Sequence, residues 1–217
     1  MRDVNTGAYR AGVWVRDSSA GIGTMTFLDP ANGTFAGLGH AISDVDTGAD
    51  ITLLSGEIVP VTVTSCTKSA AGSPGALRGE FSADAAGTVL ANDTTGVYGR
   101  YTGAPAGQSC PVLQPQEIAL GDAEIWTTVL GSEPKRYTVR IEQVNMTSSD
   151  PNRNLLIRVT DPELLEATGG IIQGMSGSPI VQNGRLVGAV THVLVNDPAR
   201  GYGIFASTML QKADGIA

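Results

Sequence analysis

The chain has 217 residues, and 41% of them are hydrophobic, which is enough to bury a sizeable core in one β domain or in two small barrels that share an interface. Its formal net charge is −7, from 21 acidic and 14 basic residues. Because no cluster of Lys and Arg interrupts this acidic balance, we expect no nucleic-acid partner.

The sequence lacks the usual membrane and export signals. No stretch approaches the ~20 consecutive apolar residues of a membrane-spanning helix. Residues 1–7 have neither the basic start nor the apolar run of a signal peptide. We therefore expect no membrane span in this chain, and a targeting segment outside it if the protein is exported.

Two cysteines and two histidines are too irregularly spaced for a common zinc site, so we expect no metal and no cofactor. Cys66 and Cys110 either form one disulfide or remain separate buried thiols, and the second state is favoured.

Short β-branched runs separated by Gly and Pro predict an all-β chain of many short strands. Strands are predicted at residues 13–16, 23–27, 58–64, 123–129, 137–142, 155–159, 179–181, 185–191 and 201–205. Residues 161–170 predict a short helix with Asp161 as its N-cap, and residues 207–213 predict a helix that closes the chain. The polar segment 91–116 could divide one domain into two barrel halves, roughly 1–110 and 111–217.

The strongest chemical motif is Gly174-Met175-Ser176-Gly177-Ser178-Pro179. A serine nucleophile needs an exposed hydroxyl on a tight turn, with backbone amides directed at the developing oxyanion. The motif is similar to the Gly-Asp-Ser-Gly-Gly-Pro of trypsin-like proteases, which assigns Ser176 as nucleophile and the amides of Gly174 and Ser176 as the oxyanion hole. On its own, a Gly-x-Ser-Gly string is more often an ordinary β-turn.

The order of elements after Ser176 strengthens the likeness. A strand, the Asn183-Gly184 hairpin turn and a return strand through Thr191 and His192 follow, then a loop over residues 196–200 and a strand with Gly201 and Gly203. In trypsin-like enzymes the return strand pairs with the substrate, and the last strand forms a wall of the specificity pocket. We therefore expect a trypsin/chymotrypsin-like double β-barrel with substrate-binding residues Thr191, His192, Gly201 and Gly203.

The base has two candidates, His40 and His192. A lone histidine is usually structural, but a two-barrel enzyme takes its base from the first barrel and its nucleophile from the second, which favours His40. The orienting acid stays open on spacing alone. Asp161 precedes Ser176 by fifteen residues but also suits a helix cap, Asp84 follows His40 by forty-four residues, and Asp44 and Asp46 lie in a segment that resembles a turn.

The chain also resembles the SpoIVB-type sporulation peptidases. The resemblance rests on motifs spread over nearly the whole chain, at residues 6–17, 20–24, 38–48, 72–75, 160–165 and 170–193. It implies a serine endopeptidase with His40, Asp161 and Ser176 as the catalytic residues, and so favours Asp161 over Asp84.

The resemblance further implies an extracytoplasmic location, in the space between forespore and mother cell. There such an enzyme cleaves itself and a membrane-bound regulator, which leads to activation of a late sigma factor. The membrane segment and PDZ domain that usually precede the peptidase in this family are expected to be absent from this chain.

Two other classes of function remain open at this stage. One is a non-catalytic module that binds a peptide by β-pairing along Val190, Thr191 and His192. The other is an unrelated β-rich structural protein, in which the motifs above would be coincidental.

Overall fold

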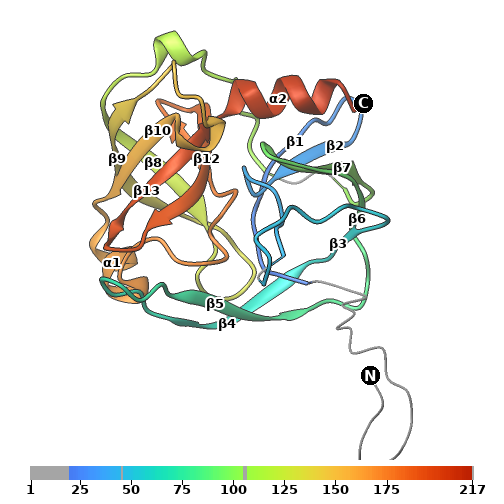
Figure 1. The fold of residues 1–217 in the computed structure, drawn as a ribbon, viewed down its shortest axis with the longest axis horizontal. Helices are drawn as coiled ribbons and strands as arrows, with labels where there is room; N and C mark the ends of the chain where they lie inside the picture. Colours follow the sequence, from blue (N-terminus) through green and yellow to red (C-terminus); the bar gives the residue numbers. More distant parts are fainter. Residues whose placement is uncertain (1–19, 45, 105–106, 217) are drawn as a thin grey trace, which may run out of the picture.

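The computed structural model describes residues 20–44, 46–104 and 107–216, which form two β-rich halves side by side (Figure 1). The strands of the first half are β1 (Met25–Leu28), β2 (Thr34–Gly37), β3 (Glu57–Ile58), β4 (Val61–Thr67), β5 (Ala76–Phe81), β6 (Gly87–Asp93) and β7 (Gly96–Tyr101). Those of the second half are β8 (Gly121–Thr127), β9 (Lys135–Val144), β10 (Leu155–Val159), β11 (Pro179–Gln182), β12 (Arg185–Leu194) and β13 (Asp197–Phe205). The helices are α1 (Pro162–Thr168) and α2 (Ala206–Asp214), with short 3₁₀ turns η1 (Pro115–Glu117) and η2 (Pro151–Arg153).

The second half is a closed barrel with strand order β10-β13-β12-β11-β8-β9. Alternate residues of each strand point into it, as Tyr137, Val139 and Ile141 do on β9, and these side chains are buried. This half confirms the predicted β-barrel, and the Asn183-Gly184 turn has the positive φ angles, 52° and 74°, that a tight hairpin needs.

The first half is a curled half-barrel, which together with the closed barrel confirms the predicted trypsin-like double-barrel fold. Its sheet, β1-β2-β7-β6-β3, is open, and β4 and β5 form a separate hairpin that runs beneath both halves (Figure 1). Hydrogen bonds to the second half hold the hairpin there. Val63 and Gly131 exchange amide-to-carbonyl bonds of 2.7 and 2.8 Å, and the Leu77 amide donates to Gln173 O at 2.8 Å. Because the hairpin's edges pair with the other half, they do not close the first sheet.

Both predicted helices are confirmed. Asp161 caps α1, and Gly169 ends it with a left-handed φ of 74°. The strand predicted at residues 13–16 lies outside the described residues. Segment 197–200, expected as a loop, is the start of β13. Cys66 and Cys110 are both free thiols. None of the described helices is long and apolar enough to cross a membrane.

A small buried core joins the two halves to α2, which starts beside the second half and runs over the top of the first (Figure 1). It consists of Ala36 and Tyr98 from the first half, Ala189 and Ile204 from the second, and Met209 and Ala213 from α2. Burial raises the pKa of Tyr98 to about 12; the charge of Asp93 adds to this, and a hydrogen bond from Thr95 opposes it. The phenol therefore stays neutral, and its hydroxyl shares a 2.8 Å hydrogen bond with Thr95 Oγ1.

Met209→Ala tests how much this core stabilises the association of the halves. Met209 is fully buried, so its truncation leaves a cavity and should lower the free energy of unfolding by about 2–5 kcal/mol. Met146→Ala is the matched control, because Met146 is 59% exposed and its truncation should change stability by less than about 0.5 kcal/mol. Urea unfolding would measure both, and equal effects would contradict a joining core.

Candidate active site

The Ser176 loop is a turn whose shape depends on glycine. Gly174 and Gly177 adopt φ angles of 101° and 90°, which side-chain-bearing residues rarely take. A Cβ at Gly177 would lie 2.0 Å from Thr24 O and 2.5 Å from Leu38 N. The Gly-x-Ser-Gly pattern is therefore needed to place Ser176 close against the first half of the molecule.

Residues leading into β1 hold this loop from the first half. The Thr24 amide donates to Ser176 O at 2.9 Å, and the buried Thr26 Oγ1 donates to Gly177 O at 2.8 Å. Thr24 O in turn accepts from the Leu38 amide at 3.2 Å, two residues before His40. No local sequence pattern reveals this connection, because it joins residues far apart in the chain through backbone atoms.

The Ser176 hydroxyl is half-buried and donates a 2.8 Å hydrogen bond to Thr191 O on β12. In this conformation the hydroxyl proton is directed at a backbone carbonyl and not at a histidine. Nucleophilic attack therefore requires the side chain to turn away from Thr191.

The predicted oxyanion donors have no competing partner. Among the described residues, the amides of Gly174 and Ser176 donate to no protein acceptor. They are thus available to a ligand oxygen, as the oxyanion prediction requires.

His40 and His192 lie together, with ring centroids 4.7 Å apart and planes inclined by 35°. His40 Nδ1 lies 2.7 Å from Ala41 O. Because a carbonyl oxygen can only accept, Nδ1 carries the proton and Nε2 is the basic nitrogen of the neutral ring. A backbone carbonyl thus fixes the tautomer that a general base needs.

Asp161 and Asp44, two of the predicted acids, accept hydrogen bonds from backbone amides. Asp161 accepts from the Leu164 amide at 3.1 Å and from the Thr138 amide at 3.2 Å, and no described contact joins it to His40. Asp84 is exposed between β5 and β6, and Asp44 accepts from Asp46 and Thr47 within a turn. The structure shows the capping role of Asp161, and its triad role stays a prediction.

The four predicted substrate-binding residues divide into two groups. Thr191 and His192 lie beside Ser176 and His40, as their contacts show. A Cβ on Gly201 would approach Ile171 and His192 O, whereas one on Gly203 would meet Ala189 O at 2.8 Å and Ile180 at 3.0 Å. Gly203 is therefore packed in the barrel interior. These contacts do not support its predicted role in a pocket wall.

The environment of His192 favours its neutral form. Although part of the ring is exposed, burial of the rest lowers its pKa, and positive charge on His40 or Arg153 lowers it further, against the opposing charge of Asp150. Since the unfolded chain binds the proton more readily, protonation of His192 destabilises the folded state as the pH falls below the ordinary value of about 6.5.

His192→Gln should remove this contribution to the pH dependence of stability. Between pH 7.5 and 5, we expect the free energy of unfolding to fall less steeply for the variant than for the wild type. Urea unfolding across that range measures the two slopes, and parallel curves would contradict the assigned environment.

A protein-family model and some solved structures match this chain. A sequence model of the SpoIVB peptidase S55 family matches residues 7–210. No curated protein gave a match. Two solved structures of the M. tuberculosis Rv3671c protease are distantly similar. The active form is 16% identical, with 93% of this chain and 94% of that chain covered and a TM-score of 0.44. A mutant in the inactive form is 18% identical, with 71% and 80% covered and the same TM-score. On the match to nearly its whole length, the chain belongs to the SpoIVB peptidase S55 family of serine peptidases.

Proposed function

We propose that this serine peptidase cleaves peptide bonds with Ser176 as nucleophile and His40 as general base. The observation that carries the proposal is the His40 tautomer, with its basic Nε2 free, next to a nucleophile loop held by the first half of the molecule. His192 has no such bond from a ring nitrogen within the described residues.

In the reaction, the Ser176 hydroxyl leaves Thr191 O and gives its proton to His40 Nε2 as Oγ bonds to the scissile carbonyl carbon. The amides of Gly174 and Ser176 hold the resulting oxyanion, and one such donor typically contributes ~2.7–4 kcal/mol of transition-state stabilisation. The C–N bond then breaks as His40 protonates the leaving amine. Water, deprotonated by the same histidine, hydrolyses the acyl-enzyme.

The proposal keeps Asp161 as the orienting acid, on the resemblance of its segment to the family. In the present conformation Ala41 O accepts the Nδ1 proton, and a neutral carbonyl stabilises an imidazolium less than a carboxylate does. Asp161 would therefore have to leave its capping contacts to act as the third member of a triad.

The family supports a protein substrate. We propose that the enzyme cleaves itself and a membrane-bound sporulation regulator, outside the cytoplasm in the space between forespore and mother cell. Cleavage of these targets would place the enzyme in the signalling step that leads to activation of a late sigma factor.

Ser176→Ala should abolish cleavage of a casein-like substrate and self-cleavage, with little loss of stability, because the half-buried hydroxyl makes one hydrogen bond. A fluorophosphonate reagent should label Ser176 alone, as mapped by mass spectrometry. The exposed Ser82→Ala is the control and should behave as the wild type. Undiminished cleavage by Ser176→Ala would reject the mechanism. Peptide binding without cleavage by the wild type would favour the non-catalytic module.

Asp161→Asn separates the two roles of Asp161. As the orienting acid, its replacement by an amide favours the wrong His40 tautomer, and we expect kcat to fall by roughly 10⁴-fold. The amide can still accept from one of the two backbone amides, so the melting temperature should fall less than in Asp161→Ala. Full activity in the Asn variant would leave Asp161 as a helix cap only.

A further inference from the structure

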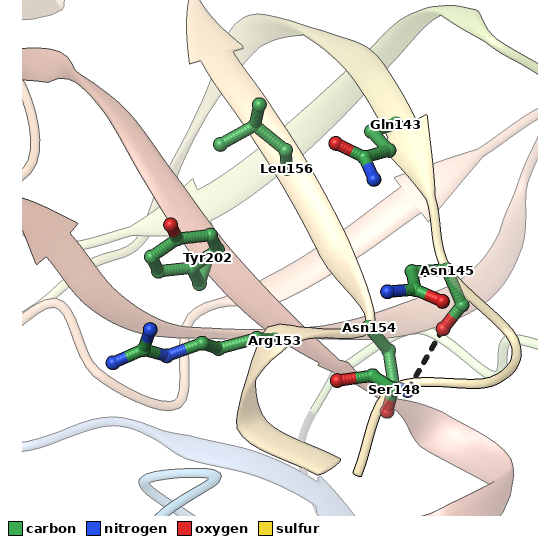
Figure 2. A pocket seen from close by; sticks show the side chains of 7 residues that line it. All are labelled: Gln143, Asn145, Ser148, Arg153, Asn154, Leu156 and Tyr202. Carbon is green, nitrogen blue, oxygen red and sulfur yellow. Dashed lines mark hydrogen bonds between the residues drawn. The ribbon is translucent and has the colours of Figure 1, made fainter. Parts of the chain in front are cut away.

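The short turn η2 places one buried amide side chain at the boundary between the two halves. Asn152 is 7% exposed, and its backbone amide donates to the N-cap Asp150 at 3.0 Å. The neighbouring Arg153 pairs with Asp150 at 3.1 Å, and its guanidinium lies 5.1 Å from the ring centroid of Tyr202 on β13 (Figure 2). Contacts with the second half therefore fix η2 in place.

The Asn152 side chain reaches from η2 into the first half. Its Nδ2 donates to Gly39 O at 2.7 Å and to Thr94 O at 3.0 Å. Both partners are carbonyl oxygens, so the orientation of the amide is set and both of its hydrogens are used. Gly39 immediately precedes His40, and Thr94 lies in the turn between β6 and β7.

The backbone of Asn152 continues the connection toward the nucleophile. Asn152 O accepts from Thr191 Oγ1 at 2.7 Å, and Thr191 O accepts from Ser176 Oγ at 2.8 Å. One residue thus binds both the segment before His40 and the strand residue that holds the Ser176 hydroxyl.

The segment before His40 is one that needs such support. Leu38 and Gly39 have φ angles of 65° and 71°, and the left-handed region is unfavourable for Leu. A strained conformation of this kind persists only where neighbouring contacts hold it. The bond from Asn152 to Gly39 O is one of these contacts.

We propose that Asn152 is a positioning residue that sets the place of the His40 ring relative to Ser176. This inference rests on the proposed function, because it concerns the geometry between base and nucleophile. A displacement of about 1 Å between reacting groups can lower a rate by about 10²-fold. Loss of the two side-chain bonds should therefore slow the chemical step more than it weakens substrate binding.

Asn154 provides a matched control. It is 6% exposed, lies two residues further along, and its Nδ2 also donates to a backbone carbonyl, Asn145 O at 3.1 Å (Figure 2). Its partner lies within the second half, however, so removing this bond does not release the segment before His40. Asn154→Ala and Asn152→Ala should destabilise the protein to a similar extent and differ in activity.

The experiment compares the wild type with Asn152→Ala, Asn152→Asp and Asn154→Ala at a temperature where circular dichroism shows each to be folded. The Asp variant preserves the side-chain volume but cannot donate when ionised. The readouts are the rate of Ser176 labelling by a small fluorophosphonate, and kcat and KM for a peptide. We expect both Asn152 variants to be labelled about 10²-fold more slowly, with the loss in kcat and little change in KM. Asn154→Ala should stay within about threefold of the wild type.

Folded Asn152 variants labelled as fast as Asn154→Ala would overturn the positioning role and leave the proposed function intact. Failure of both Asn152 variants to fold, with Asn154→Ala folded, would also overturn it, because Asn152 would then serve the fold as a whole. A wild type that is not labelled on Ser176 would refute the proposed function and this inference together.

Discussion

The Thr24 amide and the Thr26 hydroxyl donate to the carbonyls of Ser176 and Gly177, so the segment leading into β1 binds the nucleophile loop directly. The left-handed Gly177 makes this approach possible, because any side chain there would collide with Thr24 O. The geometry of the site therefore depends on how the two halves are held together. The buried core that the two halves share with α2 holds them together on one side. The hydrogen bonds between the β4–β5 hairpin and the second half add a second attachment.

The proposed base and the proposed nucleophile each make a hydrogen bond to a backbone carbonyl in this conformation. His40 is held as the tautomer with a basic Nε2, whereas the Ser176 hydroxyl is bonded to Thr191 O. In the proposed mechanism, the Ser176 side chain must turn away from Thr191 O before it can give its proton to His40. Beside His40, burial of part of the His192 ring lowers the pKa of His192, and positive charge on His40 lowers it further. Thr191 accepts from the Ser176 hydroxyl and donates to Asn152 O, and the Asn152 side chain donates to Gly39 O, so these contacts link Ser176 to the segment before His40.

Local patterns predicted the second half better than the first. The apolar segment 155–159 is β10, with alternate residues buried, and Asp161-Pro162 with Gly169 marks both ends of α1. Strands β6 and β7 were missed because Asn92, Asp93 and several glycines resemble a loop, and their stability comes from pairing with distant strands. The Gly-x-Ser-Gly motif predicted a tight turn at Ser176, and the positive φ angles of Gly174 and Gly177 confirm that turn. The bonds of Thr24, Thr26 and Asn152 go to backbone carbonyls of residues remote in sequence, and no local pattern encodes them.

An experimental structure of the protein after reaction with a phosphonate would test the central claim that the joined halves assemble a hydrolytic site at Ser176. The account predicts an adduct on Ser176 Oγ, detached from Thr191 O. One phosphoryl oxygen should lie within about 3 Å of the Gly174 and Ser176 amides, with His40 Nε2 in hydrogen-bond reach of the adduct. An adduct on another serine, or a phosphoryl oxygen turned away from both amides with His192 at the reacting group, would contradict it.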